Sequence, residues 1–146
     1  MFLLAAFAAF AVTGTAHAKS SSKSFYLTQT SFTGSQATTA CATGYHMASI
    51  WEIVDPSNLT YNKTLGLTQD DTGFGPPSSV IGWVRTGDVP LGDRNCAGWT
   101  TSEYYYRGLT VYLNSAFDLT PSSLGPWIGL LRTCDTGDAG VWCVSD

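Results

Sequence analysis

The sequence predicts an α+β fold, with two short helices early in the chain and a twisted antiparallel sheet late. Gly, Ser and Thr are abundant and charged residues make up only 12% of the chain, a composition typical of β-rich or loop-rich proteins rather than helical bundles. Segments compatible with helices precede Pro56, whereas most aromatic and β-branched segments follow residue 79. Helices and strands that are segregated along the chain favour α+β over alternating βαβ units.

The chain begins with an apolar run, residues 1–18, that ends in the tripeptide Ala-His-Ala. This pattern predicts a secretory signal peptide cleaved after Ala18. The run is too short to anchor the protein in a bilayer, and no later stretch is long and apolar enough to span one. We therefore expect a polar leader at residues 19–24 and a single domain at residues 25–146, located in the periplasm, at the cell surface or in the medium.

The first predicted elements of the domain are a strand and a short helix. The segment "FYLTQ" (25–29) is rich in aromatic and β-branched residues and predicts the strand. A run of small residues closed by Gly44 then predicts a helix that carries Cys41.

A second helix is predicted after Ser49, because Glu52 follows it at the spacing of a capping box. Pro56 ends this helix. Residues 57–79 are rich in Gly and Pro and predict a long loop. The strand-like segments that follow are 80–86, 108–113, 127–131 and 141–144.

Cysteine use predicts disulfide bonds. The predicted mature chain keeps Cys41, Cys96, Cys134 and Cys143, and an even number in an exported protein favours two disulfides, with three possible pairings. A zinc site is the alternative, but no pair has the close ligand spacing of such sites. His46 is the one histidine after cleavage, so we expect no metal centre.

Charge argues against two classes of partner. The net charge is −4 and the isoelectric point is near 4.8. The few basic residues are scattered singly, so no basic patch can neutralise phosphates. We expect neither nucleic acid nor anionic membranes as partners.

Two Asp-Thr-Gly triplets, beginning at Asp71 and Asp135, suggest an aspartic protease. Such an enzyme needs two carboxylates about 3 Å apart at the ends of buried strands, and neither triplet directly follows an apolar strand. The triplets are better explained as turns, in which Asp bonds its own backbone and Gly takes a positive φ. The second triplet is predicted to be the turn of a hairpin that leads from Cys134 into the strand 141–144.

Other acidic residues give weak catalytic or metal-binding patterns. Paired acids, such as Glu103 with Asp70 or Asp71, make a hydrolase the alternative function, although nothing in the sequence places them together. The acids around the two triplets lack the alternating ligand spacing of a calcium loop. No catalytic residue and no cofactor is predicted.

Aromatic residues provide the candidate binding surface. Tyr104, Tyr105 and Tyr106 are consecutive, and three adjacent side chains of a strand cannot all face one core, so at least one is expected at the surface. Exposed rings stack on sugars or anchor protein partners. The tryptophans are instead expected in the core, because Trp is highly buried on average: Trp51, Trp83, Trp99, Trp127 and Trp142.

The order of these segments, together with "YHMASIWEI", "GWVRTG", "NCAGWTTS" and "TCDTGDAGVWCVSD", resembles the C-type-lectin-like fold. The chain is most similar to its endostatin-like branch and to exported bacterial domains of the same layout. The most specific matches are the Cys-x-x-Trp-Thr pattern at 96–100 and the Trp-Cys-Val pattern near the end of the sequence. The resemblance implies two nested disulfides, Cys41–Cys143 and Cys96–Cys134.

The chain also departs from sugar-binding members of that fold. It lacks the Glu-Pro-Asn or Gln-Pro-Asp triplet and the Trp-Asn-Asp motif that serve calcium-dependent members, and it lacks the zinc-binding histidines and the basic patch of endostatin. We therefore expect a binding module that recognises glycan or protein without that calcium site. The alternatives are the hydrolase and a purely structural surface domain, and the oligomeric state stays open.

Overall fold

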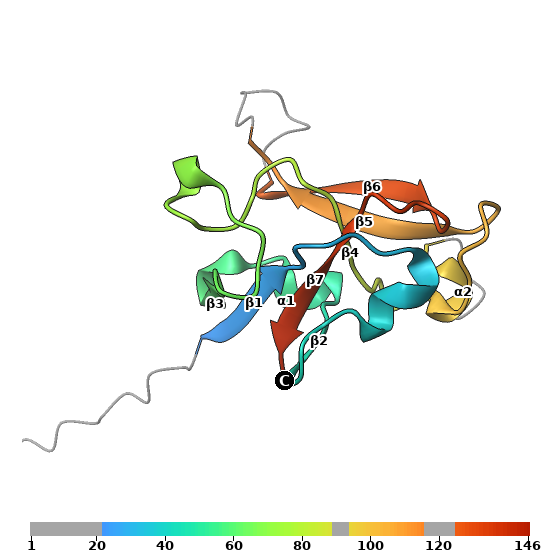
Figure 1. Cartoon of the computed structure of the whole chain (residues 1–146), viewed down its shortest axis with the longest axis horizontal. Helices are drawn as coiled ribbons and strands as arrows, with labels where there is room; N and C mark the ends of the chain where they lie inside the picture. Colours follow the sequence, from blue (N-terminus) through green and yellow to red (C-terminus); the bar gives the residue numbers. More distant parts are fainter. Residues whose placement is uncertain (1–21, 89–93, 116–124) are drawn as a thin grey trace, which may run out of the picture.

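The computed structural model describes residues 22–88, 94–115 and 125–146 (Figure 1). The predicted signal peptide and residues 19–21 of the predicted leader lie outside these residues. The helical segments are short: α1 (Ile50–Ile53), α2 (Cys96–Trp99) and the 3₁₀ turns η1 (Gly34–Thr39), η2 (Pro56–Asn58) and η3 (Asp70–Thr72). The strands are β1 (Lys23–Leu27), β2 (Tyr45–Met47), β3 (Leu59–Tyr61), β4 (Gly82–Trp83), β5 (Arg107–Leu113), β6 (Trp127–Thr133) and β7 (Gly140–Ser145).

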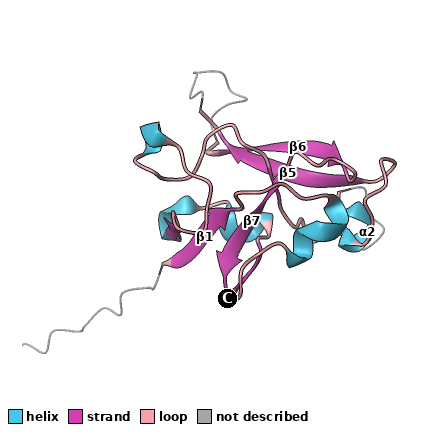
Figure 2. Ribbon diagram, viewed as in Figure 1, coloured by secondary structure: helices cyan, strands magenta, loops and turns pink. Residues whose placement is uncertain are grey.

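The described strands form one sheet in the order β3-β1-β7-β4-β5-β6, with β2 paired to β7. Figure 1 labels these strands, and Figure 2 colours the strands magenta. Strand β7 is antiparallel to β1 and β2 but parallel to β4. Strand β3 runs parallel to β1, while β5 is antiparallel to β4 and β6. The mixed α+β class with a mostly sheet body is confirmed, but the sheet is mixed rather than antiparallel.

Side chains of β1 and β7 alternate between two buried clusters, as the two-residue period of a strand requires. Phe25 pairs with Val144 and Leu27 with Trp142, on one face. Tyr26 pairs with Cys143 on the other face. Because β7 lies between other strands and is covered on both faces, it is the centre of the core.

Both disulfides predicted from the resemblance are present. Cys41 is bonded to Cys143 and Cys96 to Cys134, with S–S distances of 2.02 and 2.06 Å. One detail of the prediction is wrong: Cys41 lies beyond η1, which ends at Thr39. The Cys41–Cys143 bond ties this segment to β7, and the Cys96–Cys134 bond ties α2 to the end of β6.

Helix α1 begins as predicted. Ser49 is its N-cap, and both reciprocal hydrogen bonds of the capping box with Glu52 are present. The helix ends at Ile53, before Pro56, which instead opens η2. No helix in the described ranges is long and apolar enough to cross a membrane.

Several segments differ from their predictions because tertiary pairing decides them. The predicted loop 57–79 contains β3 and η3, and the predicted strand 80–86 is reduced to the two residues of β4. Strands also occur early, and α2 is a late helix, so the two kinds of element are not segregated along the chain. Strand β1 begins at Lys23, inside the predicted leader.

The predicted hairpin around the second Asp-Thr-Gly triplet is wrong. Strands β6 and β7 flank the triplet but do not pair with each other, because β6 pairs with β5 and β7 pairs with β1, β2 and β4. Gly73 has the positive φ (63°) expected of such a triplet, whereas Gly137 is not among the positive-φ glycines. The second triplet is a connection between separated strands.

Candidate ligand-binding site

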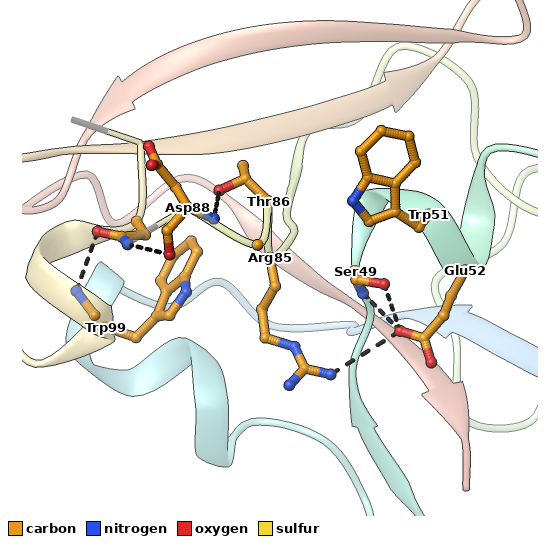
Figure 3. A pocket seen from close by; sticks show the side chains of 10 residues that line it. Ser49, Trp51, Glu52, Arg85, Thr86, Asp88 and Trp99 are labelled. Carbon is orange, nitrogen blue, oxygen red and sulfur yellow. Dashed lines mark hydrogen bonds and ion pairs between the residues drawn. The ribbon is translucent and has the colours of Figure 1, made fainter. Parts of the chain in front are cut away.

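A pocket of about 490 Å³ lies between the start of α1, the segment after β4 and the turn of α2 (Figure 3). Residues 49–52 contribute one wall, residues 85–88 the middle, and residues 95–99 the other wall. Backbone hydrogen bonds hold the first two segments together: Ile50 N–H donates to Arg85 O and Arg85 N–H donates to Ala48 O, each at 2.8 Å. The pocket therefore joins segments that are distant in sequence.

Trp51 is the most exposed large apolar side chain of the described residues, at 75% of its surface. The prediction that Trp51 lies in the core is wrong. Its indole lies beside Gly87, where an added Cβ would be 3.9 Å from Trp51 Nε1. The ring thus forms an uncovered wall of the pocket (Figure 3).

The other described tryptophans follow the prediction more closely. Trp83 and Trp142 are fully buried, Trp99 is 8% exposed and Trp127 is partly buried. Trp99 packs edge-on against Trp83, with ring centroids 5.9 Å apart, and its remaining exposed part lines the pocket.

Arg85 lies between Trp51 and Trp99 (Figure 3). Its Nε donates to Met47 O at 2.8 Å, which fixes the guanidinium. Its Nη2 is 3.9 Å from Glu52 Oε2, an ion pair without a hydrogen bond. The Arg85 side chain is 45% exposed, so the guanidinium faces the pocket and solvent.

Glu52 is held by hydrogen bonds on both oxygens. Oε2 accepts from the Ser49 N–H and hydroxyl at 2.9 and 2.8 Å, and Oε1 lies 2.9 Å from His46 Nε2. Desolvation raises the pKa of Glu52, but the bonds from Ser49 and His46 outweigh it and lower the pKa from 4.5 to about 2. Glu52 is therefore a fixed anion near neutral pH, with no proton to donate.

The wall at α2 has an unusual backbone. Four consecutive residues have positive φ: Cys96 (49°), Ala97 (54°), Gly98 (73°) and Trp99 (65°). The left-handed region costs an L-residue other than Gly about 1–2 kcal/mol. The Cys96–Cys134 disulfide and the bond from Gly98 N–H to Asn95 Oδ1 (3.1 Å) hold the turn in place. Such strain is concentrated at functional sites, and here it positions Trp99 at the pocket.

The predicted tyrosine segment lies outside this pocket. All three side chains are exposed, at 58% for Tyr104, 73% for Tyr105 and 42% for Tyr106. They occupy the turn before β5 rather than a strand. The ring centroids of Tyr104 and Tyr105 are 3.8 Å apart. A hydrogen bond between the two side chains raises the pKa of Tyr104. The segment is a second exposed aromatic surface, and its role as a ligand site stays a prediction.

The acids considered for a hydrolase are not brought together. Asp70 and Asp71 belong to η3, which Figure 1 shows at the opposite end of the molecule from the turn that leads into β5, where Glu103 lies. Neither group lines the pocket. Across the described ranges, no three His, Cys, Asp or Glu side chains are grouped to hold a metal ion.

The sequence contains a signal for the exposure of Trp51 that the average burial of Trp does not capture. Ile50 and Ile53 are three residues apart and share one face of α1, so the intervening Trp51 points elsewhere. Arg85 carried no comparable signal, because its position beside α1 depends on pairing between distant segments.

The pocket offers an uncovered aromatic wall, guanidinium donors and polar residues such as Ser49 and Thr86. This combination suits the binding of a polar ligand with flat apolar faces. With its pKa lowered to about 2, Glu52 has no proton to donate near neutral pH and is only a weak base. Comparisons with known protein families, with curated proteins and with solved structures found no match.

Proposed function

We propose that this protein is an exported binding module of C-type-lectin-like fold that recognises glycans through the pocket between α1 and α2, without a calcium site. One observation carries the proposal: Trp51, 75% exposed, forms the wall of a pocket that also contains Arg85 and Asp88. Sugars combine apolar ring faces with hydroxyl edges, so an aromatic wall beside polar groups matches their chemistry.

The energetics of Trp51 support a ligand there. Removing a large apolar side chain from water stabilises a protein or a complex by roughly 1.5–3 kcal/mol. Folding does not bury Trp51, so a ligand that covers its ring can gain this free energy. Aromatic side chains with one exposed face are frequent energetic centres of binding sites. The strained turn at α2 supports the same location, because it costs stability while placing Trp99 opposite Trp51.

The lectin-like fold and the export are supported by different observations. The two disulfides join the pairs that the resemblance implies, and disulfides persist in oxidising compartments. The apolar run that ends at Ala18 has the pattern of a cleaved signal peptide. Sequencing the N-terminus of the protein recovered from its host would test the cleavage.

A glycan array of the protein beginning at residue 22 tests the function. We expect reproducible binding that persists in EDTA and is lost in Trp51→Ala. Phe74→Ala is the matched control, because Phe74 is also an exposed aromatic residue, 57% exposed, and lies outside the pocket. Neither variant should change the unfolding midpoint by much, since both side chains are largely in solvent.

The tyrosine segment is tested on the same array. If the variant with Tyr104, Tyr105 and Tyr106 all changed to Ala loses binding while Trp51→Ala retains it, the site is the tyrosine segment and the pocket proposal is wrong. If no glycan is bound, the module recognises another class of ligand or serves as a structural surface domain, and the glycan proposal fails.

A further inference from the structure

Arg85 offers more hydrogen-bond donors than the protein uses. A guanidinium has five N–H donors in a rigid planar fork. Only Nε has a hydrogen-bond partner among the described residues, the carbonyl of Met47. The four N–H groups on the two Nη atoms have none there, and the side chain lines the pocket at 45% exposure. The guanidinium is therefore fixed through Nε and presents its Nη N–H groups to the pocket.

Glu52 does not take up these donors. Its carboxylate accepts from the Ser49 N–H, the Ser49 hydroxyl and His46. Its shortest approach to Arg85 is 3.9 Å, beyond hydrogen-bond distance. Because Ser49 and His46 fix the carboxylate in this orientation, it cannot rotate toward Arg85 without losing shorter bonds.

The charges around the pocket also leave Arg85 incompletely neutralised. Glu52 lies between two cations, since Lys23 Nζ is 3.9 Å from Oε1 and Arg85 Nη2 is 3.9 Å from Oε2. Asp88 lines the pocket as well, but Figure 3 shows its carboxylate and the Arg85 guanidinium pointing to opposite ends of the view. A guanidinium with Nη N–H groups that make no hydrogen bond can pair with a planar anion such as a carboxylate.

We propose that the ligand of this pocket is a glycan that carries a carboxylate, a sugar of the uronic-acid class, with the carboxylate on the Nη edge of Arg85 and the sugar ring against Trp51. This inference rests on the proposed function and narrows its ligand class. Arg pairs with carboxylates through two parallel hydrogen bonds, which adds geometric specificity to charge. An acidic peptide would satisfy Arg85 equally well but would not account for the flat, uncovered indole beside it.

Titration calorimetry with two probes that differ at the carboxyl group, one charged and one esterified, tests the inference. Trigalacturonate and its carboxyl methyl ester share ring type and length, so any difference between them reports the carboxylates. We expect the wild-type protein to bind the acid about tenfold more tightly than the ester, as charge-assisted bidentate bonding provides. The difference should shrink as ionic strength rises, because the pair is partly exposed.

Substitutions assign the difference to Arg85. Arg85→Gln should abolish the preference for the acid, and Arg85→Lys, which keeps the charge but loses the fork, should retain part of it. Arg107→Gln is the matched control: Arg107 is exposed and lies outside the pocket, so the preference should be unchanged. Thermal unfolding of each variant verifies that it is folded.

The outcomes separate this inference from the proposed function. Equal binding of acid and ester, or a preference that survives Arg85→Gln, overturns the carboxylate inference, while Trp51-dependent binding of neutral glycans would leave the function intact. Binding of hexaglutamate without binding of either sugar overturns the glycan class as well. Loss of all sugar binding in Trp51→Ala, together with loss of only the acid preference in Arg85→Gln, supports both.

Discussion

Gly34 lies directly against the buried Cys96–Cys134 disulfide. A Cβ added at this glycine would clash with Cys96 Sγ and lie 3.0 Å from Cys134 Cβ. Both cysteines are fully buried, so neither can move aside cheaply. We expect Gly34→Ala to lower the free energy of unfolding by about 2 kcal/mol, measured by urea denaturation.

Gly137→Ala is the control for this prediction. A Cβ at Gly137 would meet no atom within 4 Å, and the residue is not among the positive-φ glycines. Its effect should stay within about 0.5 kcal/mol. Equal losses in the two variants would contradict the close packing of Gly34 against the disulfide.

Glu52 makes the stability of the fold depend on pH. Its pKa falls from the ordinary 4.5 to about 2 in the folded protein, so the folded state holds the ionised form better than the unfolded chain does. The resulting stabilisation is complete above pH 4.5 and is lost as pH falls toward 2, with a size on the order of 2 kcal/mol.

Glu52→Gln tests this dependence, because Gln keeps the capping box while removing the charge. The variant should be less stable at neutral pH, and its unfolding midpoint should change less between pH 5 and pH 2 than that of the wild type. Asp55→Asn is the comparison: the pKa of Asp55 is also lowered, by Ser57, but its side chain is in solvent. If the unfolding midpoint of Glu52→Gln changes between pH 5 and pH 2 as much as that of the wild type, the pH dependence does not come from Glu52.

Single residues also show what the sequence can predict about the site. Ser49 and Glu52 were recognisable from local spacing, and the structure has both bonds of their capping box. For Trp51 the average burial of Trp gives the wrong prediction, whereas the helical periodicity of Ile50 and Ile53 places it away from their buried face. Arg85 was beyond prediction, because its pocket position depends on a bridge between residues 49 and 85 that no local pattern encodes.

At the scale of elements, the left-handed backbone of α2 is strained, and one substitution can relieve part of this strain. Ala97 has φ 54° and ψ 49° and is partly buried. Gly adopts this conformation without a Cβ penalty, although it also gains freedom in the unfolded chain. We expect Ala97→Gly to raise the free energy of unfolding by about 0.5 kcal/mol, the difference between these effects.

Ala37→Gly is the matched control for the turn. Ala37 is fully buried in η1 and is not among the positive-φ residues, so the same substitution should be destabilising there, as it removes a packed methyl group and adds chain entropy. Chemical denaturation of both variants measures the two changes in the free energy of unfolding, which should have opposite signs. Destabilisation by Ala97→Gly would show that the turn is not strained.

Elements were predictable where local signals and burial agreed. Strands β5, β6 and β7 lie close to the predicted segments, since each contains a continuous run of strand-forming residues. The short strands β2 and β3 escaped prediction because they are formed by three-residue pairings with β7 and β1. In β4, Gly82 is required by close packing, because a Cβ there would lie 2.5 Å from Leu27 Cδ1 and 2.6 Å from Trp142 Cδ1.

For the molecule as a whole, the two disulfides differ in access to solvent. Cys96 and Cys134 are both fully buried, whereas Cys41 is partly exposed and bonded to the buried Cys143. A reductant that attacks the folded protein therefore reaches Cys41 first. Mild dithiothreitol followed by alkylation and peptide mass spectrometry should label Cys41 and Cys143 before the other pair; labelling in the reverse order would contradict the described burial.

The whole sheet depends on β7, which pairs with β1, β2 and β4 and carries four consecutive residues with no exposed surface, 141–144. Deleting residues 140–146 removes this central strand, so we expect the shortened chain to lose its near-ultraviolet circular dichroism and its cooperative unfolding transition.

The deletion also removes one disulfide, and the double variant Cys41→Ala/Cys143→Ala separates the two effects. That variant keeps β7, and loop-closure entropy for a separation of 102 residues predicts a loss of roughly 4–5 kcal/mol with the transition still cooperative. A cooperative transition in the shortened chain would show that the strands on either side of β7 form separate stable units.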